Sequence, residues 1–318
     1  MIWIITLLQV FYNKIIMLSY WKHFNEIENK FKTLELRVNT PVKQFKCKEN
    51  NFFIKDENLN LNGSFKDRGV SYQIARHIQR GLNYFALSSS GNSALSACYV
   101  SKNFNAELQL FLSNKISSLK LDRIKEFSSS KIKIILTEKP RSELIKFLNT
   151  NPEYSNLRGS TDGYAYQGFK TISYELIDQV PNIDAIFIPC SSGTSSWGIY
   201  QGFNELNANI PIHICQTEKI NSIAKYFDAD YLTQSTSLAD AITDRIAHRK
   251  STIIEMIKAT QGSGWVISDH QLETDKATLT ALTSEDYSFN SLLAFSGWRK
   301  ALEKGYNYKN PVLIFSGL

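Results

Sequence analysis

Short apolar runs alternate with longer amphipathic segments along the first half of the chain. The runs at 84–88, 107–113 and 131–137 have the length and composition of buried strands. The segments around them predict helices, at 68–80, 92–104, 119–127 and 142–150.

The second half repeats this pattern. Residues 166–180 carry apolar side chains at steps of three and four and predict a long amphipathic helix. Another helix is predicted at 292–305, ended by its final glycine. Strands are predicted at 184–189, 211–217 and 311–315. Alternating strands and helices favour parallel sheets covered on both faces, so we expect an α/β protein of two lobes with a cleft between them.

Composition agrees with a folded, soluble protein. The 318 residues are 43% hydrophobic and 21% charged, and the length allows two domains that each bury a core. The net charge is +6, but lysine and arginine are scattered among acidic neighbours. A nucleic-acid binder would concentrate that charge in a patch, so no nucleic-acid partner is expected.

Cysteine and histidine are too dispersed for a disulfide framework or a metal site. The chain has neither a CxxC pair nor two histidines one helical turn apart. We therefore expect reduced thiols, a cytoplasmic location and no bound metal. The apolar run Ile2–Phe11 is too short to span a membrane and lacks a basic leader, so residues 1–16 are interpreted as a non-catalytic extension.

The first candidate for chemistry is the segment Asn60–Gly69, NLNGSFKDRG. Ser64 and Asp67 have the spacing of a helix capping box, which by itself is a complete structural explanation. It leaves Lys66 unexplained, because a lysine in the first turn opposes the positive end of the helix dipole. The same field favours the neutral amine that a nucleophile requires.

Two further polar loops lie between a predicted strand and a predicted helix. SSSGNS at 88–93 is either a common polar turn or a loop whose N–H groups and hydroxyls receive a carboxylate. CSSGTSS at 190–196 is either a generic turn or a phosphate-binding loop. It is neither a Walker A loop nor a GxGxxG loop.

Taken together and in this order, these segments resemble the fold-type II pyridoxal-phosphate (PLP) enzymes, and threonine synthases in particular. KDENLNLNGSFKDRG is similar to the lysine segment of that family, with Leu61 and Asn62 in place of a Pro-Thr pair. SSSGNSALSA is similar to its SSGNTAASA loop, and YQGFKTISYEL to its EGxKTIAxEI helix. CSSGTSS stands where relatives have a glycine-rich phosphate loop, and STSLADAI and VLIFSG also resemble family segments.

The resemblance implies a role for each matching residue. Lys66 would hold PLP as a Schiff base and move protons, Asn92 would bond the phenolic oxygen of the cofactor, and Ser316 would face its pyridine nitrogen. The implied phosphate contacts are Ser191, Ser192, Gly193, Thr194 and Ser195. The implied contacts to the substrate carboxylate are Ser89, Ser90 and Ser93.

Arg245 is a further candidate, since a guanidinium suits a phosphate group of the substrate. A solvated surface charge is an equally open interpretation of this residue.

The resemblance also implies an architecture and an assembly. A large PLP-binding lobe would comprise residues 17–50 and 160–318, and a small substrate-closing lobe residues 51–159, with the cofactor in the cleft. A homodimer acting on a small amino-acid substrate is expected, without a membrane partner.

Several reactions remain open at this level. The motifs SFKDRG and GFKT favour a threonine synthase-like lyase acting on O-phosphohomoserine. A serine/threonine dehydratase, a cysteine synthase-like β-replacement enzyme and a PLP-binding homologue without catalysis are the alternatives.

Overall fold

The computed structural model describes residues 20–36, 39–89, 91–116 and 118–317. Their contacts form two compact units, each with its own sheet. The first unit contains the described residues up to Asn39 together with Asn60–Asn62 and Lys66–Gly168, and the remainder of the chain belongs to the second. These bounds differ from the expected lobes, because the first unit includes residues 20–36 and 160–168 and the second includes residues 51–59 and 63–65. The predicted extension at 1–16 lies outside the described residues.

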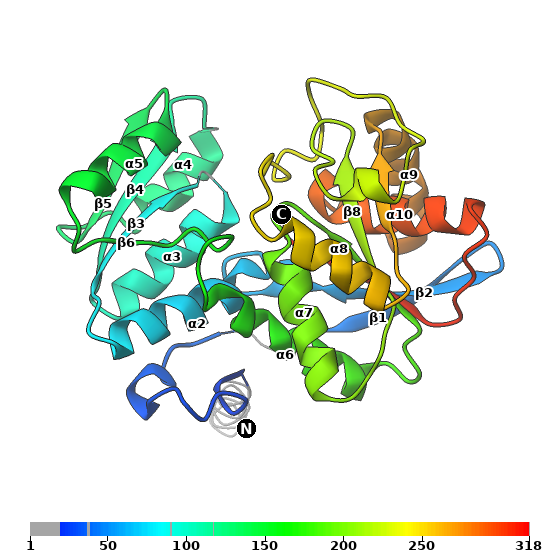
Figure 1. The fold of residues 1–318 in the computed structure, drawn as a ribbon, viewed down its shortest axis with the longest axis horizontal. Coiled ribbons are helices and arrows are strands. Elements are labelled where there is room, and N and C mark those ends of the chain that lie inside the picture. Colours follow the sequence, from blue (N-terminus) through cyan, green and yellow to red (C-terminus); the bar gives the residue numbers. More distant parts are fainter. Residues whose placement is uncertain (1–19, 37–38, 90, 117, 318) are drawn as a thin grey trace, which may run out of the picture. The chain divides into compact units, whose positions relative to one another are not determined.

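The first unit is built on a four-stranded parallel sheet of order β5-β4-β3-β6 (Figure 1). Its strands are β3 (Tyr84–Ser88), β4 (Glu107–Ser113), β5 (Ile132–Thr137) and β6 (Ser155–Asn156). The three longer strands match the predicted apolar runs. Side chains alternate between the two faces, since Phe85 and Leu87 belong to one hydrophobic cluster and Ala86 to another.

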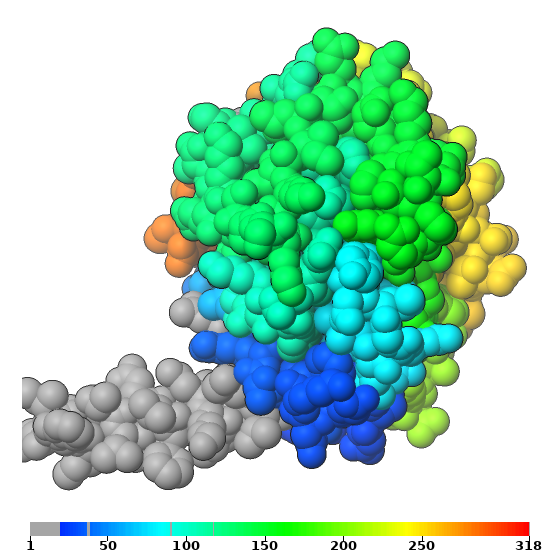
Figure 2. Space-filling model, turned by 90° about the vertical axis from the view of Figure 1, so that its left-hand side faces the viewer, coloured from blue at the N-terminus to red at the C-terminus, as the bar shows by residue number. Residues whose placement is uncertain are grey.

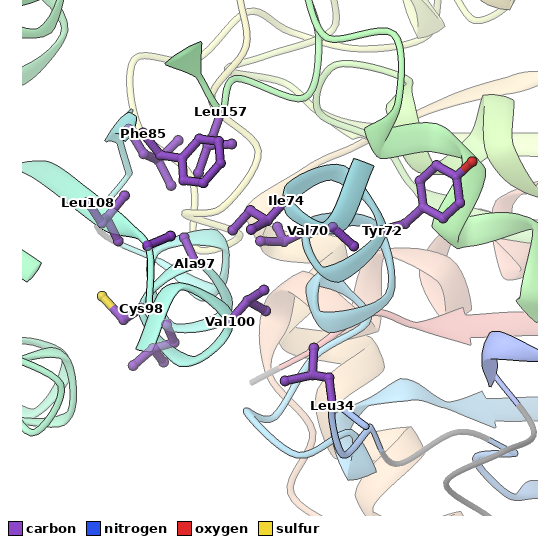
Figure 3. Packing of buried hydrophobic residues seen from close by; sticks show 14 of the residues in the cluster. Leu34, Val70, Tyr72, Ile74, Phe85, Ala97, Cys98, Val100, Leu108 and Leu157 are labelled. Carbon is purple, nitrogen blue, oxygen red and sulfur yellow. The ribbon is translucent and has the colours of Figure 1, made fainter. Parts of the chain in front are cut away.

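Helices cover both faces of this sheet. They are α2 (Lys66–Gln79), α3 (Asn92–Asn103), α4 (Ser118–Lys125) and α5 (Pro140–Thr150). Val70 and Ile74 of α2 lie against Ala97 and Val100 of α3 in the larger cluster (Figure 3). Leu144 of α5 packs on the opposite face of the sheet. The parallel sheet is therefore buried on both sides, as the alternating pattern predicts.

An aromatic segment before the first strand completes the first unit. Tyr20, Trp21 and Phe24 are buried, and the ring of Phe24 lies 4.5 Å from that of Tyr72 on α2. The short 3-10 helix η1 (Asn29–Phe31) continues this segment, which is the blue region in Figure 2 beside the cyan residues of α2. It covers apolar side chains of α2 and α3 that would otherwise face water.

The second unit has a six-stranded sheet of order β1-β2-β10-β7-β8-β9. The strands are β1 (Val42–Cys47), β2 (Asn50–Asp56), β7 (Ala185–Pro189), β8 (Ile212–Thr217), β9 (Gly264–Ile267) and β10 (Pro311–Phe315). β1 and β2 form an antiparallel hairpin, and the 3-10 helix η2 (Glu57–Leu59) follows it. The other described pairings in this sheet are parallel. The hairpin and β9 were not predicted from the sequence.

Helices cover both faces of the second sheet as well. They are α6 (Ala165–Gln179), α7 (Thr194–Glu205), α8 (Lys250–Ala259), α9 (Asp269–Thr283) and α10 (Phe289–Glu303), with the 3-10 helix η3 (Ala224–Tyr226). Ile186 and Ile188 of β7 pack with α6, α7 and α8, while Phe187 packs with α9 and α10. The α/β architecture with helix-covered, largely parallel sheets is confirmed.

The described residues include a buried histidine, but no metal-binding group and no membrane-spanning helix. Burial lowers the pKa of His213 to about 3, so its ring is neutral, and Trp265 Nε1 donates to His213 Nδ1 at 3.1 Å. Within the described residues, no group of three His, Cys, Asp or Glu side chains is arranged to hold a metal ion. In the same part of the chain, no helix has the length and apolarity needed to cross a bilayer.

Candidate active site

Lys66 is the first residue of α2 and is partly buried. The neighbouring carboxylate of Asp67 holds this end of the helix, because it accepts from the backbone N–H and from Nδ2 of Asn62, both at 2.8 Å. The helix therefore begins at a defined point. Lys66 stands in the first turn, as the sequence predicts.

A second bond joins the start of α2 to the start of α3. Ser96 donates from Oγ to Asp67 Oδ1 at 2.6 Å, and its hydroxyl also lies 3.0 Å from the carbonyl oxygen of Asn92. Asp67 and Ser96 are both fully buried. The structure thus connects the helix turns that carry two of the predicted site residues, Lys66 and Asn92, through a buried carboxylate and a hydroxyl.

Replacing Ser96 by alanine tests this connection. The buried carboxylate of Asp67 would lose one of its donors, so the free energy of unfolding is expected to fall by about 1–2 kcal/mol. Urea denaturation of both proteins measures the difference. Ser96→Thr keeps the hydroxyl and serves as the control. A loss below about 0.5 kcal/mol in Ser96→Ala would show that water replaces the serine.

Gly168 allows α6 to approach α2 closely. A Cβ atom at this position would lie 2.0 Å from the carbonyl oxygen of Arg68 and 2.7 Å from the hydroxyl of Tyr20. The Tyr20 hydroxyl itself donates to the Arg68 carbonyl. The glycine of the YQGFKT segment is therefore required by packing against the first turn of α2, two residues beyond Lys66.

In the second unit the loop 190–193 connects the end of β7 to the start of α7. Gly193 has φ 86°, a left-handed conformation that favours glycine, and an added Cβ would lie 2.5 Å from Ile253 Cγ1. The first bond within the helix runs from Trp197 N to Gly193 O. The N–H groups of 194–196 therefore form the first turn, where a helix binds anions.

Hydroxyl groups surround these amides. Thr194 and Ser195 are buried, and the Ser192 and Thr194 hydroxyls lie 3.0 Å apart. Ser191 Oγ accepts from the backbone N–H groups of Thr243 and Asp244, both at 3.1 Å. The loop thus combines backbone donors, small side chains and hydroxyls, which is the donor set that suits a phosphate group.

Ser316 leaves the sheet beside this loop. In the parallel pairing of β10 with β7, Leu313 lies opposite Phe187, so Ser316 and Cys190 follow the same edge of the sheet. The backbone of Ser316 is fixed, since its carbonyl accepts from Phe65 N at 3.1 Å. Gly317, the next residue, accepts from the hydroxyls of Ser288 and Ser291 at 2.6 and 2.9 Å.

The remaining predicted residues are divided between the two units. Ser89 and Ser93 lie at the start of α3 in the first unit, where Ser89 Oγ accepts from Gly91 N at 3.4 Å. Ser90 lies outside the described residues. Arg245 is exposed in the second unit, in the segment between η3 and α8.

Sequence reasoning missed three supporting serines, Ser96, Ser288 and Ser291. Ser288 caps α10 by accepting from Ser291 N at 3.3 Å, and its position before an apolar segment is the available signal. Ser96 gave no signal, because a serine within a helix is usually a neutral surface or packing residue.

Comparison with known proteins decides the family. Residues 33–285, most of the chain, match the protein family described as pyridoxal-phosphate dependent enzyme. The chain belongs to this family. It is a PLP-dependent enzyme of fold type II, and its cofactor is pyridoxal 5'-phosphate.

Relatives within the family have different activities. A threonine synthase of Methanosarcina acetivorans is 29% identical over 160 residues, covering 48% of this chain and 38% of that protein. A catabolic L-threonine dehydratase of Staphylococcus aureus is 24% identical over 234 residues, covering 70% of this chain and 65% of that protein. The structure of maize serine racemase has a TM-score of 0.75 at 19% identity, covering 88% of each chain, and shows the shared fold.

The residues of the second unit fit the phosphate group of PLP. Gly193 has a left-handed φ of 86° at the residue before α7, and an added Cβ would clash with Ile253, so only glycine fits this turn. The buried side chains of Thr194 and Ser195 carry hydroxyl donors. Gly193, with the hydroxyls at 191, 192, 194 and 195, would hold the phosphate.

Proposed function

We propose that this PLP enzyme is a lyase similar to threonine synthase, which converts O-phosphohomoserine to threonine. In this reaction the Cγ–O bond to phosphate breaks and inorganic phosphate leaves, Cβ loses a proton and Cγ gains one, and the hydroxyl of a water molecule bonds to Cβ. The observation that carries the proposal is Arg245, an exposed guanidinium on a segment bonded to the phosphate loop through Ser191. The matched threonine synthases support it.

Each residue of the site would then have a task. Bound PLP supplies an electron sink for the charge that develops at the substrate Cα. Lys66 Nζ would remove and return the Cα proton. Ser89, Ser90 and Ser93, with the N-terminal amides of α3, would hold the substrate carboxylate, and Asn92 would orient the ring through its phenolic oxygen.

Ser316 would influence which reaction follows. A neutral hydroxyl facing the pyridine nitrogen does not stabilise a protonated ring as a carboxylate would. The residue therefore favours elimination and replacement over transamination. This preference supports both a threonine synthase and a dehydratase.

A serine/threonine dehydratase is the second candidate. It is favoured by the staphylococcal dehydratase, whose similarity covers more of this chain than that of the threonine synthases. A dehydratase eliminates hydroxide from Cβ and needs no phosphate contact, so Arg245 would have no part in substrate binding.

Product analysis separates the two candidates. The PLP-loaded protein is incubated with O-phosphohomoserine, threonine or serine, and inorganic phosphate, threonine, 2-oxobutanoate and pyruvate are measured. Inorganic phosphate released together with threonine supports the first proposal. 2-Oxobutanoate from threonine without phosphate release from O-phosphohomoserine contradicts it and supports the dehydratase.

Replacing Arg245 by glutamine is expected to raise KM for O-phosphohomoserine by about tenfold to a hundredfold, because a charge-assisted contact to phosphate is lost. The kcat with this substrate should change less. Arg141, on α5 in the other unit, provides a control for removing one positive charge. Equal effects of Arg245→Gln and Arg141→Gln on KM would contradict a contact with the substrate.

We also expect a homodimer, as the family resemblance implies, and a cytoplasmic location, as the dispersed cysteines indicate. Light scattering of the purified protein tests the first expectation. A mass of one chain at micromolar concentration would contradict it.

A further inference from the structure

Ser191 connects the phosphate loop to a segment that follows it by about fifty residues. Its Oγ accepts from the N–H groups of Thr243 and Asp244, both at 3.1 Å. A hydroxyl oxygen has two acceptor sites, so both are occupied, while the O–H can still donate. A glycine at this position could not form these two bonds.

Asp244 fixes the turn that follows. Its Oδ1 accepts from the N–H groups of Ile246 and Ala247, both at 3.1 Å. Ala247 has φ 48°, a left-handed conformation that costs a non-glycine residue about 1 kcal/mol or more. Ser222 donates to the Asp244 carbonyl at 3.3 Å, so the backbone on this side is held from a third direction.

Arg245 lies between these two sets of bonds. The amides of 243 and 244 are held by Ser191, and those of 246 and 247 by the Asp244 carboxylate. The side chain of Arg245 is exposed, and it has no ion pair within the described part of the chain. The local structure thus fixes the backbone of an arginine whose charge is available to a ligand.

We propose that Ser191 is a positioning residue that links occupancy of the phosphate loop to the placement of Arg245. A phosphate group at the start of α7 would order the loop. Because Ser191 accepts from the amides of residues 243 and 244, these two residues would become ordered with it. Arg245 is then held where it binds the anionic group of the substrate. The identity of that group rests on the proposed function, but the linkage does not.

Hydrogen exchange of the whole chain tests the linkage without turnover. PLP is expected to slow exchange of the Thr243 and Asp244 amides in the natural protein by about tenfold. In Ser191→Ala these amides should exchange about tenfold faster without PLP, because two bonds of about 1 kcal/mol are lost, and the slowing by PLP should disappear. Ser191→Thr keeps the acceptor and should restore both.

A matched control loosens the same segment elsewhere. Asn290 Oδ1 accepts from Ala241 N at 2.9 Å, and Asn290 Nδ2 donates to Asp240 Oδ1 at 3.0 Å. Asn290→Ala should speed exchange at 241 and leave the PLP-dependent slowing at 243 and 244 intact. Ser191→Gly is the second variant if Ser191→Ala does not fold, since it also lacks the hydroxyl.

Kinetics provide the second readout. With O-phosphohomoserine, Ser191→Ala should raise KM by about tenfold, equivalent to about 1.4 kcal/mol, with a smaller change in kcat. Ser191→Thr should restore KM.

The outcomes separate this inference from the proposed function. Unchanged exchange at 243 and 244 in Ser191→Ala and Ser191→Gly would overturn the linkage even if O-phosphohomoserine is the substrate. PLP-dependent slowing that requires the Ser191 hydroxyl would support the linkage. If O-phosphohomoserine is then not turned over, only the proposed function fails.

Discussion

Replacing Lys66 by alanine is expected to lower turnover by about 10³-fold or more, because it removes the amine that we propose joins the cofactor and moves the Cα proton. The absorbance band of the protein–PLP complex should also be lost. In the natural protein, borohydride reduction should fix PLP onto Lys66, as peptide mass mapping would show. Because the side chain is only partly buried, the free energy of unfolding should change by about 1 kcal/mol or less.

Lys250 provides the matched control, because it is the first residue of α8 as Lys66 is of α2. Its Nζ lies 3.4 Å from the Tyr226 hydroxyl. Lys250→Ala should keep turnover within about twofold and leave the reduced label on Lys66. Full turnover by Lys66→Ala, or a label on another lysine, would contradict the assigned role.

Replacing Gly168 by alanine is expected to lower the free energy of unfolding by about 3 kcal/mol, since overpacking against backbone cannot be relieved by a side-chain rotation. The new Cβ would lie 2.0 Å from the Arg68 carbonyl oxygen, so α2 or α6 must shift. A displacement of about 1 Å at Lys66 would lower turnover by about 10²-fold. Urea denaturation and steady-state kinetics measure the two effects.

Gly163 is the control for this substitution. It lies five residues earlier, and an added Cβ there has no neighbour within 4 Å among the described atoms. Gly163→Ala should change the free energy of unfolding by about 0.5 kcal/mol or less and preserve turnover. If Gly168→Ala behaved like Gly163→Ala, close packing of α6 on α2 would not position the first turn of α2.

The strands and helices of the α/β framework were largely predictable. β3 and β4 coincide with the predicted runs, and β7, β8 and β10 lie within one residue of them. These strands are buried on both faces over most of their length and are therefore mainly apolar, which is a local signal. Six helices were predicted from apolar residues at helical spacing, because one face of each packs on a sheet, whereas α8 and α9 were not predicted.

The hairpin of β1 and β2 was not predictable in the same way. β1, VKQFKC, lies at the edge of the sheet and is partly exposed along its length, so its polar residues conceal the strand. β2 joins the six-stranded sheet by pairing in parallel with β10, which lies more than two hundred residues later in the chain. This pairing places residues 51–59 in the second unit.

Some residues of the candidate site were also predictable from the local sequence, whereas their long-range contacts were not. Lys66 and the loop 190–195 were singled out because each lies where a predicted helix begins, next to small polar residues, and Ser316 was implied by the family resemblance of VLIFSG. The bond from Ser96 to Asp67 joins residues 29 positions apart, and the bond from Asp244 to Ser191 joins residues 53 positions apart. No local pattern indicates either pair.

The sequence by itself indicated most strands and helices and the candidate lysine, because apolar periodicity and short polar motifs are properties of neighbouring residues, and its motifs carried the resemblance that implied the family and its cofactor. Only the tertiary structure decided that residues 20–36 cover α2 and α3, that Gly168 is required by the Arg68 carbonyl, and that Ser191 holds the turn of Arg245. These contacts depend on which distant segments the packed core brings within hydrogen-bonding or van der Waals distance. Packing and register set that distance, and neither is encoded in a local run of residues.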